Sequence, residues 1–487
     1  MKPKHIFLRK PAILLSLCIL FISSFMLTAA SAEEKVSAPK PPSINFVESQ
    51  GTIGATIHFT VEGLKPGAPA KLLWETYKGS YKIEGVYTFI GPEYKREIPV
   101  LATGTADQSG NWIGSFAVPK GFGGDHTVYV RQNNQVVAQN SLFIAPTFHL
   151  SPESGPVGTE ITVQAEGISY ATMESNWQLT YDNKMTGLLS AVSTNGTATA
   201  KLRAAGPAGT HTITIFHGYL GMPYMNYTEA PTAYLPVPSF TFKVTDEAPL
   251  KQNEVEAQPK AAGGGVVLPA LKHKTGVTAS LSRTSGQVGE LVTLKASGMP
   301  ASKKVDLVWH TMEGSRVSGN GFAEKIKPLG TAQTDKNGSL SYDFPVPDDL
   351  GGVPHLIEIK VGGETYAEAQ LAITPSIVKM TPSSGPAGTE ITIQIKGVGW
   401  TEYDNAYYLD YDNAYMGYMC GFNSQGTVTF TVIASGQPGY HIIDLYPGLY
   451  RGKQANPDVY VAPQLTYGAD HPGSAIPAIR MGFEITE

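Results

Sequence analysis

The sequence predicts an all-β protein made of tandem β-sandwiches, and three observations support this. Short runs of alternating apolar and polar residues indicate half-buried strands, as in 57–63 and 161–167. Turn residues recur about every 8–12 positions, and the 487 residues include 52 Gly and 35 Pro. Long stretches repeat far along the chain, whereas no long segment has the apolar spacing of a helix.

The N-terminus has the three parts of a secretory signal peptide. Four basic residues precede an uncharged stretch from Pro11 to Ala32, which ends in Ala-Ser-Ala and is followed by two glutamates. This pattern predicts a signal peptide at 1–32, cleaved after Ala32, and then a short linker at 33–42. Because the apolar stretch is long for a signal, retention as a membrane anchor is the alternative. After cleavage we expect no membrane span.

A block of the chain occurs twice. The segment that starts Ser151-Pro-Glu-Ser-Gly-Pro returns as Thr381-Pro-Ser-Ser-Gly-Pro, 230 positions later, and Tyr181-Asp-Asn returns as Tyr411-Asp-Asn at the same shift. Upstream, Trp74 matches Trp309. Such a constant shift indicates duplication of a two-module unit. The predicted modules 1 to 4 are 43–146, 147–245, 276–374 and 375–487.

The segments between modules differ in composition. Residues 246–275 are polar, contain Gly and Pro and are not repeated, which predicts a flexible linker. The joints at 146/147 and 374/375 are short and contain Pro, so we expect them to be stiff. The expected arrangement is two stiff pairs of modules joined by one hinge.

Each module opens with a Gly-bounded turn and an alternating strand. Modules 1 and 3 then carry a strand with Trp74 or Trp309, a long insertion, an Asp-x-x-Gly turn and closing strands. Modules of roughly 100 residues with turns at this spacing are typical of immunoglobulin-like sandwiches. In such alternating strands the two tryptophans are expected in the core.

The openings of modules 2 and 4, Ser-Pro-Glu-Ser-Gly-Pro-Val-Gly-Thr-Glu-Ile-Thr-Val and its copy, resemble IPT/TIG-type immunoglobulin-like domains. The resemblance covers about 20 residues well and the rest more loosely, with Gly209-Thr-His-Thr-Ile and Gly439-Tyr-His-Ile-Ile similar to a late strand. It implies four early-set sandwiches of the type found in bacterial extracellular proteins. It implies no catalytic residues, because the fold hosts many functions.

Charge and cysteine content exclude several classes. The net charge of -5 is small and the basic residues form no stripe, so we expect no nucleic-acid partner. The two cysteines are Cys18, within the predicted signal, and Cys420. The mature chain therefore lacks a pair for a disulfide, and Cys420 is expected to be a buried thiol.

We find none of the common catalytic, phosphate-binding or metal-binding motifs, so the chain is predicted to be non-catalytic and to need no cofactor. Asp410 and Asp412 are two residues apart and would help to hold Ca²⁺, but the copy has Thr180 and Asp182. A turn built on Asp412-Asn413 is the favoured interpretation, and no metal site is predicted.

Three histidines are predicted to be structural. His211 and His441 occupy equivalent positions, and His217 lies six residues after His211. On one strand those two would be about 20 Å apart, too far to share a metal ion.

Module 4 has a dense group of aromatic residues. A sandwich buries only alternate residues of a strand, so some of these rings are expected to face outward and to bind a ligand. The alternative is that tyrosine is simply a good strand former. The candidate ligand-binding residues are Trp400, Tyr407, Tyr411, Tyr415, Tyr446 and Tyr450.

These features predict an exported structural or adhesive binding protein, secreted or on the cell surface, with an extracellular protein or polysaccharide as partner. One alternative is a glycan-binding protein that uses the tyrosine-rich faces of modules 2 and 4. A second is an extracellular hydrolase whose site the motifs do not reveal.

Overall fold

The computed structural model describes residues 40–219, 222–257, 265–315, 321–449, 462–473 and 476–487. Within them the chain is almost entirely strand, with two short 3-10 turns, η1 (Tyr227–Glu229) and η2 (Phe422–Ser424). The all-β prediction is therefore confirmed. The predicted signal peptide, its cleavage site at Ala32 and the candidate Tyr450 lie outside the described residues. In the described part, no helix has the length and apolar character to cross a bilayer.

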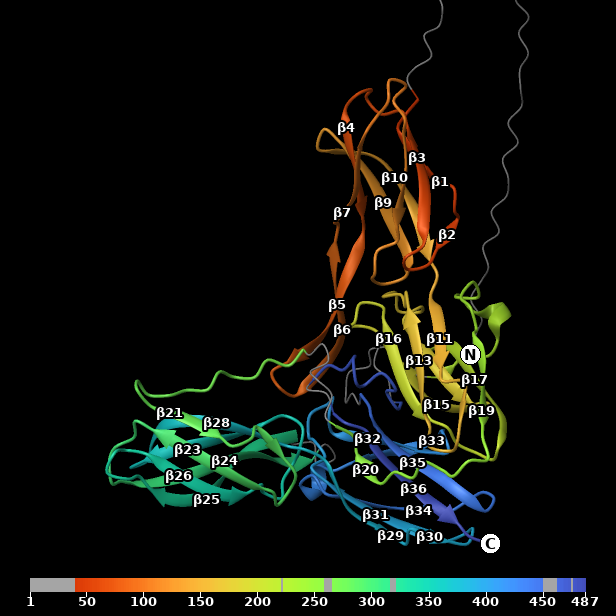
Figure 1. The fold of residues 1–487 in the computed structure, drawn as a ribbon. Helices are drawn as coiled ribbons and strands as arrows, with labels where there is room; N and C mark the ends of the chain where they lie inside the picture. Colours follow the sequence, from red (N-terminus) through yellow and green to blue (C-terminus); the bar gives the residue numbers. More distant parts are fainter. Residues whose placement is uncertain (1–39, 220–221, 258–264, 316–320, 450–461, 474–475) are drawn as a thin grey trace, which may run out of the picture. The chain divides into compact units, whose positions relative to one another are not determined.

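Modules 1 and 3 have the same sandwich topology. Each pairs a three-stranded sheet with a five-stranded one, and the labelled strands of both modules can be followed in Figure 1. In module 1 the sheets are β1 (Ser43–Phe46), β3 (Thr56–Glu62), β8 (Trp112–Ala117), and β2 (Gln50–Gly51), β10 (Gln135–Ile144), β9 (Gly124–Gln132), β4 (Pro69–Trp74), β7 (Val100–Thr105). In module 3 they are β21 (Thr278–Leu281), β23 (Leu291–Ser297), β26 (Leu340–Pro345), and β22 (Ser285–Gly286), β28 (Glu364–Ile373), β27 (His355–Val361), β24 (Lys304–Ser315), β25 (Gly321–Gln333).

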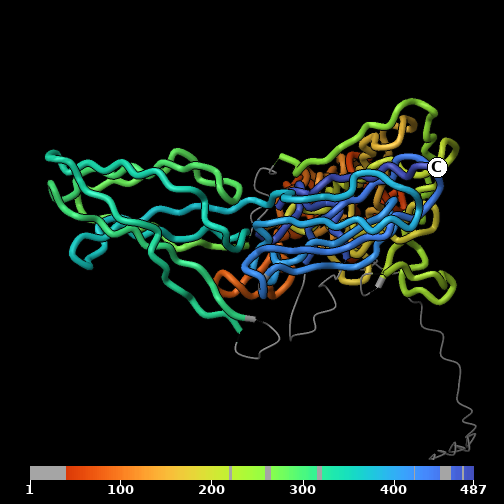
Figure 2. The backbone as a smooth tube through the Cα atoms, turned by 90° about the horizontal axis from the view of Figure 1, so that it is seen from below, coloured from red at the N-terminus to blue at the C-terminus, as the bar shows by residue number. Residues whose placement is uncertain are grey.

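The inserted segments of these two modules form hairpins. In module 1, β5 (Thr76–Glu84) pairs only with β6 (Thr88–Glu97) among the described strands. In module 3, the long strands β24 and β25 pair along their whole length, and Figure 2 shows them within the extended trace of residues 276–374. The insertion therefore became a separate hairpin in one copy and a sheet extension in the other.

Modules 2 and 4 repeat the strand order of modules 1 and 3, and the larger sheet of each gains one additional short strand. In module 2 the sheets are β11 (Thr147–Ser151), β13 (Glu160–Glu166), β16 (Ala198–Arg203), and β12 (Ser154–Gly155), β19 (Ser239–Val244), β17 (Gly209–Tyr219), β14 (Trp177–Tyr181), β15 (Lys184–Leu189), with β18 (Met222–Pro223) on β17. In module 4 they are β29 (Ser376–Thr381), β31 (Glu390–Lys396), β34 (Val428–Ile433), and β30 (Ser384–Gly385), β36 (Ile479–Ile485), β35 (Gly439–Pro447), β32 (Ala406–Tyr411), β33 (Ala414–Cys420).

The inward-facing residues of the paired sheets form the cores, because side chains alternate between the two faces of each strand. Strand β3 shows this alternation: Ile57, Phe59 and Val61 are buried and their neighbours are not. Trp74 and Trp309 are each 2% exposed, as predicted for core residues. Each stacks on a buried histidine, His126 or His355, at 4.3 and 4.4 Å between ring centroids.

Glycine allows close backbone contact at both short joints. Gly123 donates its N–H to the carbonyl of Ile168, and Gly351 donates to Val398, at 3.2 and 3.0 Å. A Cβ at either glycine would clash with the carbonyl oxygen of Gly167 or Gly397. The two joints are thus built in the same way in both blocks.

The first half of the predicted linker contacts module 4. Strand β20 (Glu254–Val255) pairs with the edge of β36. Glu256 then forms an ion pair with Arg480 at 2.7 Å. Modules 2 and 4 also contact each other, as the inter-module hydrogen bonds below show. The local strand and turn patterns did not indicate these contacts, because the residues that make them lie far apart in the sequence.

Candidate functional site

The candidate tyrosines are mostly core residues. Tyr407 and Tyr446 are 1% and 0% exposed, and Trp400 and Tyr411 are 6% and 8% exposed. Tyr415 is half-buried. The expectation that these rings form an exposed face is wrong, because Tyr407 and Tyr411 belong to the inner core of module 4 and Tyr446 lies on the outer face of the larger sheet, which is covered. Tyr446, for example, belongs to the core cluster of module 2 together with Leu465 and Tyr467.

The Asp-Asn pairs form turns, as predicted. Asp412 and Asn413 have φ of 47° and 58°, and Asp182 and Asn183 have 48° and 63°. Such left-handed pairs are typical of two-residue hairpins, here between β32 and β33 and between β14 and β15. Asp410 does not join Asp412 but lies on the buried outer sheet face. Among the described residues, no group of three or more acids, histidines or cysteines is arranged to hold a metal ion.

The predicted structural histidines have hydrogen-bonding partners. His211 lies 2.6 Å from Asp182 and His441 lies 2.6 Å from Asp412. Burial opposes the charge of His441, but the hydrogen bond and the negative charge of Asp412, together with the hydrogen bond to the Gln437 carbonyl, outweigh it and raise the pKa of His441. His217 is buried and lies 2.8 Å from the hydroxyl of Thr232. Cys420 is half-buried rather than fully buried.

A buried contact joins modules 2 and 4. Thr186 donates its hydroxyl to the carbonyl of Asn413, at 2.7 Å, and Asn413 donates its amide to the carbonyl of Arg203, also at 2.7 Å. Backbone hydrogen bonds connect Leu188 with Pro463 and Leu465 in both directions, at 2.8 and 2.9 Å. The edge strands β15 and β33 of the two modules lie side by side (Figure 1).

Arg203 is the centre of this contact. It reaches from β16 into module 4 and forms a two-point ion pair with Asp444, although the side chains are only 2% and 1% exposed. Arg480 approaches the same carboxylate at 3.0 Å. Removing such charges from water is costly unless they are paired and hydrogen-bonded, so the two arginines and Asp444 depend on each other.

The β5–β6 hairpin of module 1 also contacts module 4. Glu402 donates its N–H to the carbonyl of Tyr87, at 3.1 Å, and accepts a hydrogen bond from the N–H of Phe89 at 2.9 Å. Tyr403 donates its hydroxyl to the carbonyl of Val86 at 2.8 Å. The ring of Tyr87 stacks on Trp400, with 5.5 Å between centroids. The hairpin thus brings Val86 and Tyr87 beside module 3.

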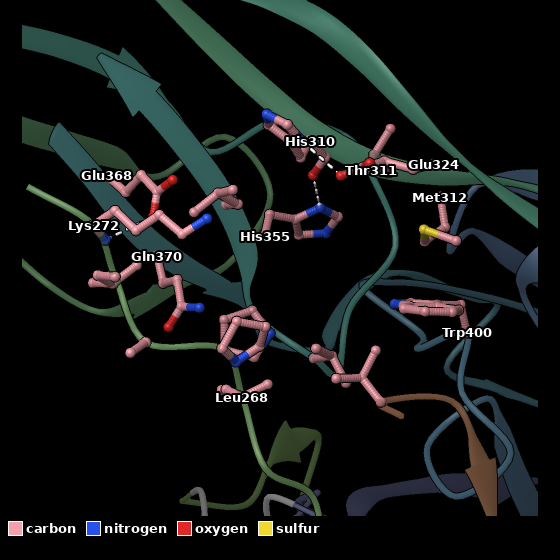
Figure 3. Close-up of a pocket in the computed structure, with 17 residues that line it drawn as sticks. Leu268, Lys272, His310, Thr311, Met312, Glu324, His355, Glu368, Gln370 and Trp400 are labelled. Atoms are coloured by element: carbon pink, nitrogen blue, oxygen red, sulfur yellow. Dashed lines mark hydrogen bonds and ion pairs between the residues drawn. The ribbon is translucent and has the colours of Figure 1, made fainter. Parts of the chain in front are cut away.

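A pocket of about 310 Å³ lies where this hairpin, the second half of the linker, module 3 and Trp400 meet. Figure 3 shows Trp400 and Met312 on one side of the pocket, and Lys272, Glu368 and Gln370 on the other. The volume is at the lower end of the range for small-molecule sites. Of the predicted ligand-binding residues that the structure describes, Trp400 is the one that lines it.

The polar side chains of the pocket are held in position by fixed partners. Glu368 accepts a hydrogen bond from the backbone N–H of Lys272 at 2.7 Å. His310 lies between Glu324 and Glu358, at 2.6 and 2.8 Å. Burial opposes the charge on His310, but these two carboxylates outweigh it and raise its pKa. Both ring nitrogens of His355 lie near backbone carbonyls, those of His310 and Leu350, at 2.8 and 2.6 Å.

Asp349, a hydrogen-bond partner of the pocket residue Thr311, connects modules 3 and 4. It accepts hydrogen bonds from Trp309 at 3.0 Å, from Thr311 at 2.8 Å and from Gln425 of module 4 at 2.6 Å. Burial opposes the ionised form of Asp349, but the hydrogen bonds from Gln425 and Thr311, the nearby His355 and the N–H of Leu350 together outweigh it and lower its pKa. A fixed carboxylate therefore supports the pocket wall formed by Thr311.

The comparisons show similarity to bacterial repeat proteins. Neither a scan against family models nor a search of curated proteins gave a match. A structure of Salmonella alpha-2-macroglobulin is similar at 9% identity, over 92% of this chain and 31% of that one, with a TM-score of 0.21. This chain thus spans about a third of that protein.

Two adhesin structures are also similar. The Escherichia coli adhesin FdeC matches at 12% identity over 68% of this chain and 96% of that one, with a TM-score of 0.17. A tetra-tandem repeat from the extending region of a large adhesion protein matches at 10% identity over 91% and 99%, with a TM-score of 0.17. None of these similarities assigns a function, and the IPT/TIG assignment stays a prediction.

Proposed function

We propose that the chain is an exported, non-catalytic immunoglobulin-like protein, with modules 2 and 4 of the IPT/TIG type, which acts in a structural or adhesive role at the cell surface or outside the cell. The pocket beside Trp400 is the place where it holds its ligand. One observation carries this proposal. Hydrogen bonds hold the β5–β6 hairpin, the second half of the linker, the segment with Trp400 and module 3 around one cavity.

The partners of the polar groups support a binding role rather than catalysis. His310 is engaged by two carboxylates, His355 by two backbone carbonyls, and the hydroxyl of Thr311 donates to Asp349. A general base must be able to reach a proton of the substrate, and a nucleophile needs such a base beside it. Here these groups already serve to hold the pocket walls.

A glycan is the favoured ligand class. The pocket combines the indole of Trp400 with the side chains of Gln370, Lys272 and Glu368. Aromatic rings pack against the apolar faces of sugars, while amide, ammonium and carboxylate groups meet hydroxyls. This moves the predicted glycan site from the tyrosine-rich sheet face, which is buried, to the pocket.

An array of soluble cell-wall and environmental polysaccharide fragments tests this proposal on the mature chain. Bound fragments should lose about tenfold in affinity, equal to about 1.4 kcal/mol, on Trp400→Leu or Gln370→Ala substitution. Tyr170→Leu is the matched control, since Tyr170 is the counterpart of Trp400 in module 2 and lies outside the pocket. Equal losses in all three variants, or binding that none of them weakens, would contradict the pocket as the site.

Export has its own test. N-terminal sequencing of the protein recovered from the culture medium or cell surface should start at Glu33. Recovery of a chain that still starts at Met1 in the membrane fraction would favour the anchor instead.

A further inference from the structure

A row of side chains crosses the outer face of the larger module 4 sheet. In the strand register, Tyr415 of β33 is opposite Asp410 of β32, Asp410 is opposite Asp444 of β35, and Asp444 is opposite Arg480 of β36. Asp410 and Asp444 are each 1% exposed. Two ionised carboxylates directly opposite each other in a dry interface repel strongly.

The two acids have very different surroundings. Asp444 is paired with Arg203 from module 2 and with Arg480. Among the described residues, neither carboxyl oxygen of Asp410 has a hydrogen-bond partner. An ionised carboxylate in that position would lack both water and a donor, which is one of the most costly states for a protein group.

The charges of the cluster balance without Asp410. Arg203 and Arg480 carry two positive charges, and Asp444 and Glu256 carry two negative ones. An ionised Asp410 would leave one buried negative charge uncompensated. Glu254, opposite Arg480 on β20, is exposed to solvent and therefore does not alter this balance strongly.

We infer that Asp410 is a neutral carboxylic acid in the folded chain, and that its ionisation loosens the contact between modules 2 and 4. Burial, and next the charge of Asp444, raise the pKa of Asp410 well above its usual range, against a smaller opposing effect of Arg480. The proton on Asp410 thus helps to stabilise the contact between modules 2 and 4.

All packed elements support this assignment. The titratable and charged groups around Asp410 are Asp444 and Tyr446 from β35, Arg480 from β36, Tyr415 from β33, Arg203 from β16, and Glu256 and Tyr467 from the segments that cover the sheet. Tyr446 and Tyr467 have pKa values raised by burial, so both stay neutral hydroxyls at physiological pH. Among the described residues of this cluster, the positive charges are those of the two arginines, and Asp444 and Glu256 are paired with them.

The direction of the pH effect follows from the raised pKa. A group that binds its proton more tightly in the folded state stabilises that state fully below its unfolded pKa, about 3.9 for Asp. This contribution is lost as the pH rises through the folded value. Between these two pKa values, the equilibrium constant for opening of the interface should increase tenfold for each pH unit, because one proton is released on opening.

Hydrogen exchange measures this opening directly. The backbone amides of Leu188, Lys201 and Leu465 donate across the interface. In the mature chain, their protection factors should fall by up to tenfold per pH unit between pH 5 and 9. In Asp410→Asn, whose amide resembles the neutral acid, protection at pH 5 should stay within about twofold of wild type and should not fall with pH.

Two further variants and one spectrum complete the test. Glu484→Gln removes a partly exposed acid of the same sheet and should leave the wild-type pH dependence intact. Asp410→Thr restores the residue found at the equivalent position of module 2 and should behave like Asp410→Asn. The infrared carbonyl band of a protonated carboxyl group should be present at pH 7 and absent in Asp410→Asn.

Three results would overturn the inference: a pH dependence that persists in Asp410→Asn, a large loss of protection in that variant at pH 5, or no protonated carboxyl band. Tightening of the wild-type interface by Na⁺ or Ca²⁺, absent in Asp410→Asn, would also overturn it, because a cation and not a proton would then neutralise the acid.

Discussion

Modules 2 and 4 have the same strand order, but the residues on the outer faces of their larger sheets differ in charge. The row Asp410, Asp444 and Arg480 in module 4 corresponds, in the same strand register, to Thr180, Thr214 and Ser239 in module 2. In module 2 the hydroxyls of Thr214 and Ser239 lie 3.1 Å apart, and Ser239 is exposed. In module 4 the row consists of ionisable side chains and is buried.

This difference shows which residues set the fold and which set the assembly. The inward residues of β13 and β31, Ile161 and Val163 against Ile391 and Ile393, are nearly identical and equally buried. The outer rows differ completely. Because alternation separates the two faces of a strand, the duplicated copy could gain a charged interface without loss of its core.

The largest expected effect is at Asp444. Asp444→Asn leaves Arg203 and Arg480 buried without their shared counter-ion and should lower the free energy of unfolding by about 3–5 kcal/mol. The equivalent change in module 2, Thr214→Asn, replaces a half-buried hydroxyl and should stay within about 0.5 kcal/mol. Urea denaturation of both variants measures the contrast. Similar losses in the two would show that the row matters for the sandwich and not for the interface.

The next largest effect is expected when each of two equivalent residues in modules 2 and 4 is replaced by the other. Arg203 of β16 corresponds to Ile433 of β34, which is 51% exposed. Arg203→Ile should cost about 2–3 kcal/mol, because Asp444 loses its charged hydrogen bonds but keeps Arg480. Ile433→Arg places a charge in water and should change stability by less than about 0.5 kcal/mol. If Arg203→Ile were as mild as Ile433→Arg, the buried ion pair would contribute no net stability.

The sequence predicted the framework better than the contacts between modules. Strand β3, the tryptophans at 74 and 309 and the Asp-Asn turns follow from local alternation and turn chemistry, which need only neighbouring residues. The tyrosines of module 4 were misjudged for two reasons. Tyr407 and Tyr411 pack in the inner core of the module, and Tyr446 lies on an outer sheet face that is covered by segments far away in the sequence. The replacement of Thr180, Thr214 and Ser239 by charged residues was the signal that the repeat comparison offered, since a charged row on a strand-rich face requires partners.

The two His-Asp pairs sharpen the comparison through pH. In both modules the histidine lies 2.6 Å from the aspartate, but the aspartate side chain is 39% exposed in module 2 and 16% in module 4. His441→Gln should cost about 1.5 kcal/mol at pH 6, because it removes a charge-assisted hydrogen bond. Since the pKa of His441 is raised, the stabilisation is complete below about pH 6.5 and is lost as the pH rises through the folded value.

Two measurements check the His-Asp prediction. An NMR titration of His441 should have a midpoint above 6.5, and the cost of His441→Gln should shrink between pH 6 and 9. His211→Gln should be milder, because solvent screens the more exposed Asp182. A cost for His441→Gln that does not change with pH would mean that packing against Tyr411, not the charge, is what the histidine contributes.

The smallest effect isolates a single hydrogen bond across the interface. Asn183 and Asn413 both have positive φ at the same turn position, so Gly is tolerated at either without strain. Asn183 is exposed, whereas Asn413 is 1% exposed and donates to the carbonyl of Arg203 at 2.7 Å. Asn413→Gly should therefore cost about 1 kcal/mol more than Asn183→Gly, the net value of one buried hydrogen bond. Combining Asn413→Gly with Arg203→Ile should cost less than the sum of the two, because both act on one contact. Strict additivity would mean that the turn stabilises module 4 alone and that its approach to module 2 is incidental.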